Sequence, residues 1–354
     1  MTYKISVIIP VYNAEKTRNR AINSILNQKW DGDLLKDIEI LLIDDCSKDK
    51  SKEIIKDYSN NYSNIKYLST EKNSGSPAQP RNIGIKHSTG NYLMFLDNDD
   101  EYCPDLCKTL YQTITAENAD IVSCNFCDID DYRIYKEYRD YFGENLVLKD
   151  SMVIYDELDA TFFVDILIWT KIFKKSLITE NNITFPNYAD DTFFSTESFI
   201  NAKKLVYLKD YYGIKRYVST ESLSHSVTLD TITTHISALL EVWDMFKNSK
   251  YDVENYKYKF ETVKYNIKTI LTLTSYLENN KDYLIALNKL YDYEKYVSFN
   301  EKLGNPVFDV VNFFILKRQI KIAFLILKIM HIFVNMSFFR FIYNTLRVFI
   351  NNRR

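Results

Sequence analysis

Glycine and proline are scarce in this chain, with seven and six residues among 354. So little of either excludes collagen-like chains and chains rich in Gly/Pro linkers. An excess of one sign of charge is also lacking, because 45 Lys and Arg stand against 47 Asp and Glu. The net charge of −2 excludes a strongly basic surface, and we expect no nucleic-acid partner. Hydrophobic residues make up 46% of the chain, which is enough for a core and excludes disorder.

The near-zero total charge conceals two oppositely charged parts. Residues 306–354 contain eight Lys and Arg and one acid, which gives a net charge of +7. Residues 1–305 contain 37 basic and 46 acidic residues, which gives −9. The chain is therefore predicted to be an acidic body with a basic, apolar tail.

Cysteine is also rare, with five residues, and the chain starts directly with a predicted strand instead of a signal peptide. We expect a cytoplasmic protein with reduced thiols. Cys103 and Cys107, followed by Cys124 and Cys127, have spacings near those of zinc sites. The second pair lies in a predicted strand, where residues three apart face opposite sides, so burial is favoured over the zinc alternative.

The first 130 residues alternate between strand and helix patterns. Unbroken apolar runs predict strands buried on both faces, at 4–10, 38–44, 65–69, 91–97 and 120–126. Helical patterns lie between them, at 14–28, 51–58, 78–87 and 104–117. This alternation predicts an α/β class with a doubly wound, mostly parallel sheet. Further along we expect helices at 170–178 and 189–202, two short strands in 205–218, and then helices only, at 231–248, 253–278 and 281–295.

The tail has no apolar run long enough to be a good transmembrane span, because Lys328 and His331 interrupt residues 322–339. Its polar residues fall instead on narrow helical stripes, formed by Lys317, Lys321, Lys328 and Asn335 and then by Arg340, Asn344, Arg347 and Asn351. Basic stripes beside wide apolar faces suit helices that lie in a membrane interface over anionic lipid. The alternative is a helical pair packed on the body or in a dimer interface, which leaves a homo-oligomer open.

Acidic residues follow two of the predicted strands. Asp44 and Asp45 end the second strand, and Asp97, Asp99 and Asp100 follow the fourth. The carboxyl ends of parallel strands form the ligand-binding edge of such a sheet. Carboxylates gathered there would repel one another and favour a divalent cation such as Mg²⁺ or Mn²⁺, or a polyhydroxy ligand. A single acid of this kind would be read as a turn or helix cap.

Three ordered motifs, KISVIIPVYN, ILLIDDCSKD and NSGSPAQPRNIGIKHSTGNYLMFLDNDD, resemble the inverting family 2 glycosyltransferases, which have the GT-A (Rossmann-like) fold. The resemblance covers about residues 1–225. NSGSPAQPRN is most similar to the branch of wall-teichoic-acid and capsular-polysaccharide glycosyltransferases. Cys46 is a departure, because the family often has Gly after the two acids of the second strand.

The resemblance implies a role for each motif residue. The nucleotide-sugar donor would be bound by Pro10 and Tyr12 at the base, Asp45 or Asp44 at base or ribose, Arg81 and Asn82 under the nucleotide, Asp97 near the ribose or sugar, and Arg216 at the diphosphate. Mn²⁺ or Mg²⁺ would be held by Asp99, Asp100 and His225. Trp169 could stack on a sugar, although a core tryptophan is the alternative.

A second acidic pair, Asp190 and Asp191, lies where the family has its general base. We predict that Asp191 is this base, since inversion needs a carboxylate on the acceptor side to take the hydroxyl proton. Asp190 departs from the family's commoner Glu and would position the acceptor. The alternative is a pair of acids that begins the helix over 192–202.

The sequence therefore predicts three parts: a GT-A catalytic domain (1–225), a helical domain (226–305) and basic amphipathic helices (306–354). The expected function is metal-dependent, inverting transfer of a sugar from a UDP-sugar or similar donor. The acceptor would be a glycan or polyol phosphate, namely a hydroxyl of a cell-surface polysaccharide, a teichoic acid or a lipid-linked glycan precursor. The protein would be peripherally attached to the inner face of the cell membrane. The alternatives are a non-catalytic scaffold, and a nucleotidyltransferase, which would need a Gly-rich phosphate loop after the first strand.

Overall fold

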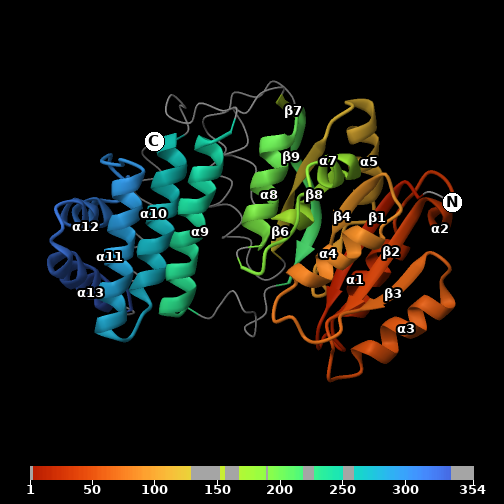
Figure 1. Ribbon diagram of the computed structural model, residues 1–354, viewed down its shortest axis with the longest axis horizontal. Helices are drawn as coiled ribbons and strands as arrows, with labels where there is room; N and C mark the ends of the chain where they lie inside the picture. Colours follow the sequence, from red (N-terminus) through yellow and green to blue (C-terminus); the bar gives the residue numbers. More distant parts are fainter. Residues whose placement is uncertain are drawn as a thin grey trace. The chain divides into compact units, whose positions relative to one another are not determined.

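The computed structural model describes residues 3–128, 152–155, 167–188, 190–217, 227–249 and 259–335. The chain divides into two compact units, Met1–Thr220 and Glu221–Arg354. Among the described residues, the first unit holds a nine-stranded sheet flanked by helices (Figure 1). Its strands are β1 (Ile5–Val11), β2 (Ile38–Asp44), β3 (Ile65–Ser69), β4 (Tyr92–Phe95), β5 (Glu101–Tyr102), β6 (Ile121–Asp128), β7 (Met152–Tyr155), β8 (Lys171–Lys174) and β9 (Leu205–Arg216). Its helices are α1 (Arg18–Leu26), α2 (Leu34–Asp37), α3 (Ser51–Asn61), α4 (Ala78–His87), α5 (Leu106–Ala116), the 3₁₀ turn η2 (Ile168–Thr170), α7 (Lys175–Glu180) and α8 (Asp190–Asn201).

The first four strands in the sheet order are parallel and confirm the predicted α/β class. β2 pairs with β1 and β3, and β1 also pairs with β4. Every residue of β1 and β2 is buried, as expected for apolar strands covered by helices on both faces. Gly84 lets α4 lie close to the sheet, since a Cβ there would be 2.4 Å from Cγ2 of Ile8.

The remaining strands make the sheet mixed. The order is β3-β2-β1-β4-β8-β6-β9-β5, with β7 paired to β9. β8 runs antiparallel to both β4 and β6, and β5 and β7 run antiparallel to β9, whereas β6 and β9 are parallel. Because β8 runs antiparallel to β4, the end of β4 lies beside the start of β8. The acids that follow β4 are therefore near the segment that begins at residue 167.

The helix predicted over 170–178 is wrong in its first half. Lys171–Lys174 form β8, and α7 begins at Lys175. Ile172 and Phe173 are completely buried between β4 and β6. A short apolar run fits a helix face and a strand equally well, so neighbouring strands decide its structure. The two strands predicted in 205–218 are one continuous strand, β9, with register shifts opposite β6.

The second unit contains only helices among its described residues, as predicted. They are α9 (Leu229–Lys247), α10 (Lys259–Ser275), α11 (Asn280–Tyr296), α12 (Pro306–Leu316) and α13 (Ile320–Asn335) (Figure 1). Thr228, Asn279 and Asn305 cap α9, α11 and α12 through their side chains, which satisfies backbone donors at each start. α12 and α13 pack on each other and on α11. The predicted division at residue 305 stays a prediction. No helix of the described segments is long and apolar enough to cross a bilayer.

Candidate active site

Three carboxylates meet at Arg81 of α4. Its Nη2 donates to Asp97 Oδ1 at 2.8 Å, and its Nη1 donates to Asp190 Oδ2 at 2.7 Å and to Asp191 Oδ1 at 2.6 Å. Only 3% of the Arg81 side chain is exposed, so solvent screens these ion pairs weakly. Burial lowers the pKa of Arg81, but the three carboxylates outweigh it and raise the pKa above its ordinary value. Arg81 therefore joins the loop after β4 to the start of α8.

Asp191 stands in the first turn of α8, where the positive helix end favours acids. Burial raises the pKa of Asp191 to about 7, together with the charges of Asp190 and Asp97, while Arg81 and Lys171 oppose the rise. A carboxyl group that titrates near neutral pH is well matched to general-base catalysis. The geometry therefore gives the predicted base both a fixed position and a suitable pKa.

The loop after β4, here called the acidic loop, contains Asp97, Asp99 and Asp100. Burial raises the pKa of Asp100 to about 8, and the charges of Asp97 and Asp99 add to this effect. Burial and Asp97 also raise the pKa of Asp99. Asp100 Oδ1 accepts a hydrogen bond from the backbone N–H of Tyr217 at 3.0 Å, which offsets only part of the repulsion. Burial is the larger cause of both raised pKa values, and the charges of the neighbouring carboxylates add to it.

This crowding fits a divalent cation held by Asp99 and Asp100. In the described part of the chain, no group of three or more His, Cys, Asp or Glu is arranged to hold a metal by itself. Mg²⁺ in particular needs no such cage, because it usually takes one or two carboxylates and completes its shell with substrate phosphates and water. His225, the third predicted ligand, lies outside the described residues.

The predicted base pocket lies at the ends of β1 and β2. Pro10 is buried within β1, whereas Tyr12 just beyond it is 41% exposed. Asp44 Oδ1 accepts from the backbone N–H of Ser47 at 3.1 Å. Asp45 is almost fully buried and accepts from the Thr70 hydroxyl, the Asn73 amide, and the backbone and hydroxyl of Ser74. Asp45 thus fixes the loop that leads into α4.

The other predicted residues contact protein groups. The Asn82 amide donates to the backbone carbonyl of Phe185 at 2.8 Å and accepts from its N–H at 2.9 Å, so it holds the segment before Asp190. Trp169 is 4% exposed and packs edge-to-face on Phe126, as a core tryptophan does. The Arg216 guanidinium lies 4.8 Å from the centre of the same ring, and its charge lowers the pKa of Asp100.

Three residues near the site were missed by sequence reasoning. Lys171 is completely buried and donates to the Leu167 carbonyl at 2.6 Å, and its charge opposes the raised pKa of Asp191. A lysine in the apolar run KIFK was the available signal. Arg20 and Tyr217 had no comparable signal, because their importance depends on contacts between distant segments.

Tyr217 and Arg20 brace the acidic loop from the outside. The Arg20 guanidinium stacks 3.3 Å above the Tyr217 ring and donates to the backbone carbonyl of Asp99. The Tyr217 hydroxyl donates to Glu101 Oε2 at 2.9 Å, and Lys215 Nζ pairs with Glu101 Oε1 at 2.7 Å. Groups outside the direct ligands commonly set the affinity of a metal site by fixing their orientation.

Tyr217→Phe is expected to weaken Mn²⁺ binding at the acidic loop by about tenfold. The substitution removes the hydroxyl that holds Glu101 but keeps the ring that stacks on Arg20. The measurement is the Mn²⁺ concentration for half-maximal UDP binding. Tyr207→Phe is the matched control on β9, the strand that ends just before Tyr217, since the Tyr207 hydroxyl donates to Asn125 Oδ1 at 2.7 Å. Identical Mn²⁺ dependence in both variants would refute the brace.

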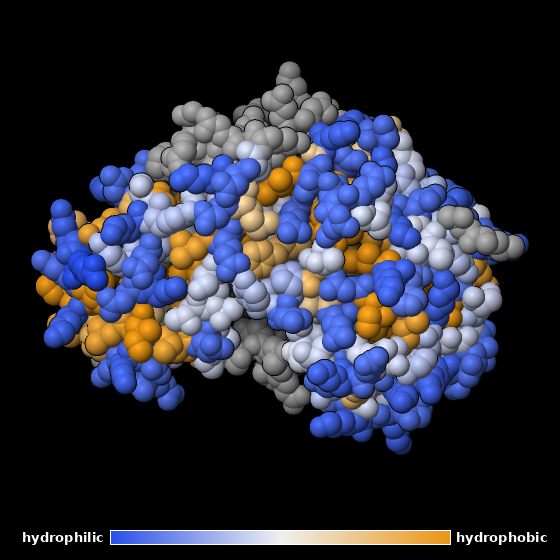
Figure 2. Space-filling model, in the orientation of Figure 1, coloured by the Kyte–Doolittle hydropathy of each residue, from blue (hydrophilic) through white to orange (hydrophobic). Residues whose placement is uncertain are grey.

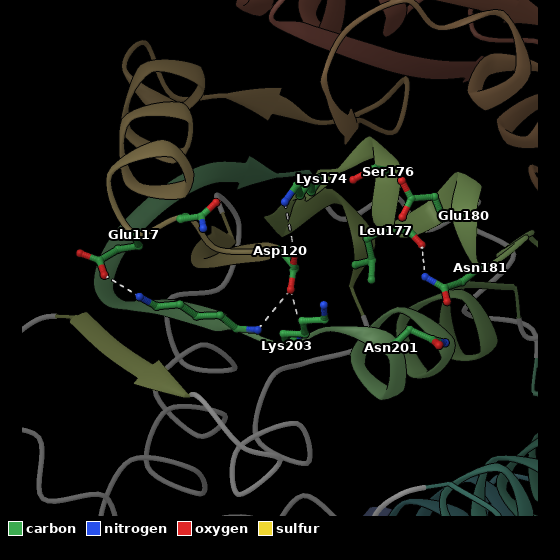
Figure 3. Close-up of a pocket in the computed structure, with 11 residues that line it drawn as sticks. Glu117, Asp120, Lys174, Ser176, Leu177, Glu180, Asn181, Asn201 and Lys203 are labelled. Atoms are coloured by element: carbon green, nitrogen blue, oxygen red, sulfur yellow. Dashed lines mark hydrogen bonds and ion pairs between the residues drawn. The ribbon is translucent and has the colours of Figure 1, made fainter.

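A separate pocket of about 580 Å³ lies at the other end of the strands (Figure 3). Lys174 on its wall pairs in register with Tyr92, the first residue of β4, whereas the acidic loop follows the last residue of that strand. Its charges compensate one another: Glu117 pairs with Lys204 at 3.0 Å and Asp120 with Lys174 at 3.8 Å (Figure 3). This pocket is not part of the acidic site.

None of the four cysteines considered for zinc forms a disulfide with another described residue. Cys107 and Cys124 are buried, and Cys124 Sγ lies 3.4 Å from the Thr170 carbonyl oxygen while Cys127 Sγ lies 3.5 Å from that of Ile214. Burial raises the pKa of Cys103 to about 11. The predicted burial is therefore confirmed for Cys107 and Cys124, whereas Cys103 and Cys127 are partly exposed.

The chain resembles known proteins both in sequence and in fold. The model of Glycosyl transferase family 2 matches residues 6–169. The poly(ribitol-phosphate) beta-glucosyltransferase of Bacillus spizizenii is 32% identical over 219 residues, which are 60% of this chain and 32% of that protein. TarP of Staphylococcus aureus, a poly(ribitol-phosphate) beta-N-acetylglucosaminyltransferase, is 30% identical over 246 residues, which are 68% of this chain and 71% of that protein.

The crystal structure of residues 1–349 of Staphylococcus aureus TarS in complex with UDP-GlcNAc has a similar fold. It matches with a TM-score of 0.66 and 20% sequence identity over 92% of this chain and 90% of that chain. The likeness confirms the predicted GT-A fold followed by helices. The match to the Bacillus relative covers only about a third of that relative's length.

Proposed function

Because the chain belongs to glycosyl transferase family 2, we propose that it is a metal-dependent, inverting transferase that moves a sugar from a UDP-sugar to an acceptor hydroxyl. The observation that carries this proposal is the Arg81 junction. The buried guanidinium of Arg81 pairs both with Asp97, in the loop after β4, and with Asp191, at the start of α8. A donor-side acid and an acceptor-side base are thereby fixed relative to each other.

On the donor side, Asp99 and Asp100 would hold Mn²⁺ or Mg²⁺ against the diphosphate. When bound, the ion neutralises the negative charge that develops on the leaving group. Burial and then the repulsion between neighbouring acids raise the pKa values of Asp99 and Asp100, and a bound cation would relieve the repulsion. Tyr12 at the exposed end of β1 would cover the base.

On the acceptor side, Asp191 would take the proton of the attacking hydroxyl. The acceptor oxygen forms a bond to the anomeric carbon while the bond from that carbon to the diphosphate oxygen breaks, which inverts the configuration. Arg81 offsets part of the repulsion between Asp97 and Asp191 and restricts the base to one position. Such pre-positioning supplies much of the rate enhancement in transfer reactions.

The relatives support the substrate classes. The Bacillus and Staphylococcus proteins are named for transfer to poly(ribitol phosphate), and the TarS crystal contains UDP-GlcNAc. We therefore propose a hexose or N-acetylhexosamine donor linked to UDP. The proposed acceptor is a hydroxyl of a teichoic acid, another cell-surface polysaccharide or a lipid-linked precursor. We also propose that the protein works at the inner face of the cell membrane as a peripheral protein.

The test is a panel of UDP-, GDP- and CDP-sugars with Mn²⁺ or Mg²⁺, read by thermal shift and by hydrolysis of the donor. One or more UDP-sugars should raise the melting temperature, since a ligand at 100 times its Kd stabilises the folded state by about 2.7 kcal/mol. The same sugars without metal should give a smaller shift. Protection by GDP- or CDP-sugars alone would refute the UDP assignment, and no response to any donor would refute the transferase.

A further inference from the structure

The helices α12 and α13 expose an unusual number of large apolar side chains. Phe313 is 55% exposed and Leu325 is 56% exposed. Among residues 306–330, the exposed large apolar side chains of these two helices, here called the outer face, are Val307, Val310, Phe313, Ile322, Leu325 and Ile329. Figure 2 shows apolar surface over the part of the helical unit where α12 and α13 lie. A helix that is apolar on its outer as well as its packed side usually has a second apolar surrounding.

The packed side of the two helices is already occupied. Phe308, Val311 and Ile315 of α12 and Leu327 of α13 are buried, and both helices contact α11. The outer face is therefore additional to the core of the helical unit. Exposed apolar area of this kind costs free energy in water, at roughly 25 cal/mol for each Å² that could be buried.

The charges beside the outer face are mostly of one sign. From residue 307 to 335 there are four Lys and Arg and one acid, Asp309, whose carboxylate accepts a hydrogen bond from the Leu303 N–H. Lys317 and Lys321 are exposed at the turn between α12 and α13, and Arg318 is exposed while lying 5.1 Å from the ring centre of Tyr291. The outer face thus combines apolar side chains with a basic edge.

One member of the predicted polar stripe does not belong to this edge. Lys328 Nζ donates to the Leu277 carbonyl at 3.1 Å and lies 4.9 Å from the centre of the Tyr283 ring. Its ammonium group therefore contacts other residues of the helical unit. The basic surface is therefore concentrated at Lys317, Arg318 and Lys321, and does not continue along α13.

We propose that the outer face of α12 and α13 docks on an anionic lipid surface. Its apolar side chains would enter the interfacial region, and the basic turn would lie against lipid phosphates. Over the residues that the structure describes, neither helix is long and apolar enough to cross a bilayer, so they would lie along its surface. A second copy of this chain fits less well, because α12 and α13 hold only one acid for the partner's cations, Asp309, and that carboxylate already accepts a hydrogen bond from the Leu303 N–H.

This inference deepens the proposed location of the protein, but it rests on the helical unit alone. Vesicle binding needs neither donor nor acceptor, and sugar transfer to a soluble acceptor needs no vesicle. Failure of one proposal can therefore be distinguished from failure of the other.

The experiment is sedimentation of the full chain with phosphatidylcholine vesicles, with and without phosphatidylglycerol. The chain should sediment only with the anionic vesicles. Lys317→Glu with Lys321→Glu should lower the partition coefficient at least tenfold, since each cation near such a surface contributes about 1 kcal/mol and 1.4 kcal/mol is tenfold. Phe313→Ser with Leu325→Ser should lower it by a similar factor.

Matched controls lie on exposed helix positions of the first unit. Lys52→Glu with Lys86→Glu makes the same change in net charge, and Leu35→Ser removes an apolar side chain that is 41% exposed. Both controls should sediment as the unchanged protein does. Retained circular dichroism and UDP binding would show that each variant is folded.

Three results would overturn the proposal. The first is a full chain that never sediments with anionic vesicles. The second is an equal loss in the control variants. The third is an outer-face variant that sediments normally but changes from oligomer to monomer in analytical ultracentrifugation, which would assign the face to a second copy of the chain.

Discussion

Asp191→Asn is expected to lower kcat by about 10²–10⁴-fold, the usual contribution of a general base, with little change in UDP affinity. The amide keeps the size of the side chain and its place at the start of α8, but it cannot take a proton. Asp190→Asn is the matched control, because it neutralises the neighbouring acid, which contacts the same Arg81 nitrogen. The control should lose less activity.

The pH dependence gives an independent measure of the same group. The pKa of Asp191 is raised to about 7, so the base is protonated and inactive below that pH. In the unchanged enzyme, kcat/KM should rise with pH and level off above 7, since this parameter reports the free enzyme. This acid limb should be absent from the residual activity of Asp191→Asn. Normal turnover in Asp191→Asn, or the same limb in both proteins, would eliminate Asp191 as the base.

The parallel half of the sheet could be predicted because each of its strands shows its burial in its own residues. A strand buried on both faces must be apolar at every position, and β1 and β2 show this pattern directly in the sequence. β8 could not be predicted in the same way. Its four residues are a strand only because β4 and β6 lie on either side of it.

The same distinction holds for the site. Acids at the ends of β2 and β4 could be located from the sequence, because parallel strands bring their carboxyl ends to one edge. The junction at Arg81 could not, since Arg81 and Asp191 are 110 residues apart and meet only through the sheet. The contacts of Asn82 with Phe185 and of Trp169 with Phe126 could not be predicted either. A motif identifies the residue type at a position, whereas its contacts depend on segments that the motif does not contain.

For the tail, too, the sequence predicted the residue types and the helices but not their contacts. The excess of basic residues after 306 and the apolar helices could be read from the sequence. The periodicity placed Lys328 on the same stripe as Lys317, yet Lys328 contacts Leu277 and Tyr283. A stripe on one helix does not show which of its residues a neighbouring helix covers.

Asp99→Ala is expected to abolish the Mn²⁺ dependence of UDP affinity. In the unchanged protein Mn²⁺ should strengthen UDP binding, because the ion joins the acidic loop to the diphosphate. Removal of a ligand should cost at least the 10–100-fold that loss of an outer-shell partner typically costs. Isothermal titration calorimetry with and without Mn²⁺ measures this directly. Asp105→Ala is the matched control, because Asp105 lies beyond the loop and accepts from the Tyr211 hydroxyl at 2.9 Å.

The metal-free measurement makes this prediction sharper. Without metal, the acidic loop repels a diphosphate, and this repulsion falls when one of its carboxylates is removed. Asp99→Ala should therefore bind UDP at least as well as the unchanged protein in the absence of Mn²⁺, and more weakly in its presence. A general disruption of the site would weaken binding under both conditions. Unchanged Mn²⁺ dependence would show that the ion, if it binds, is held elsewhere.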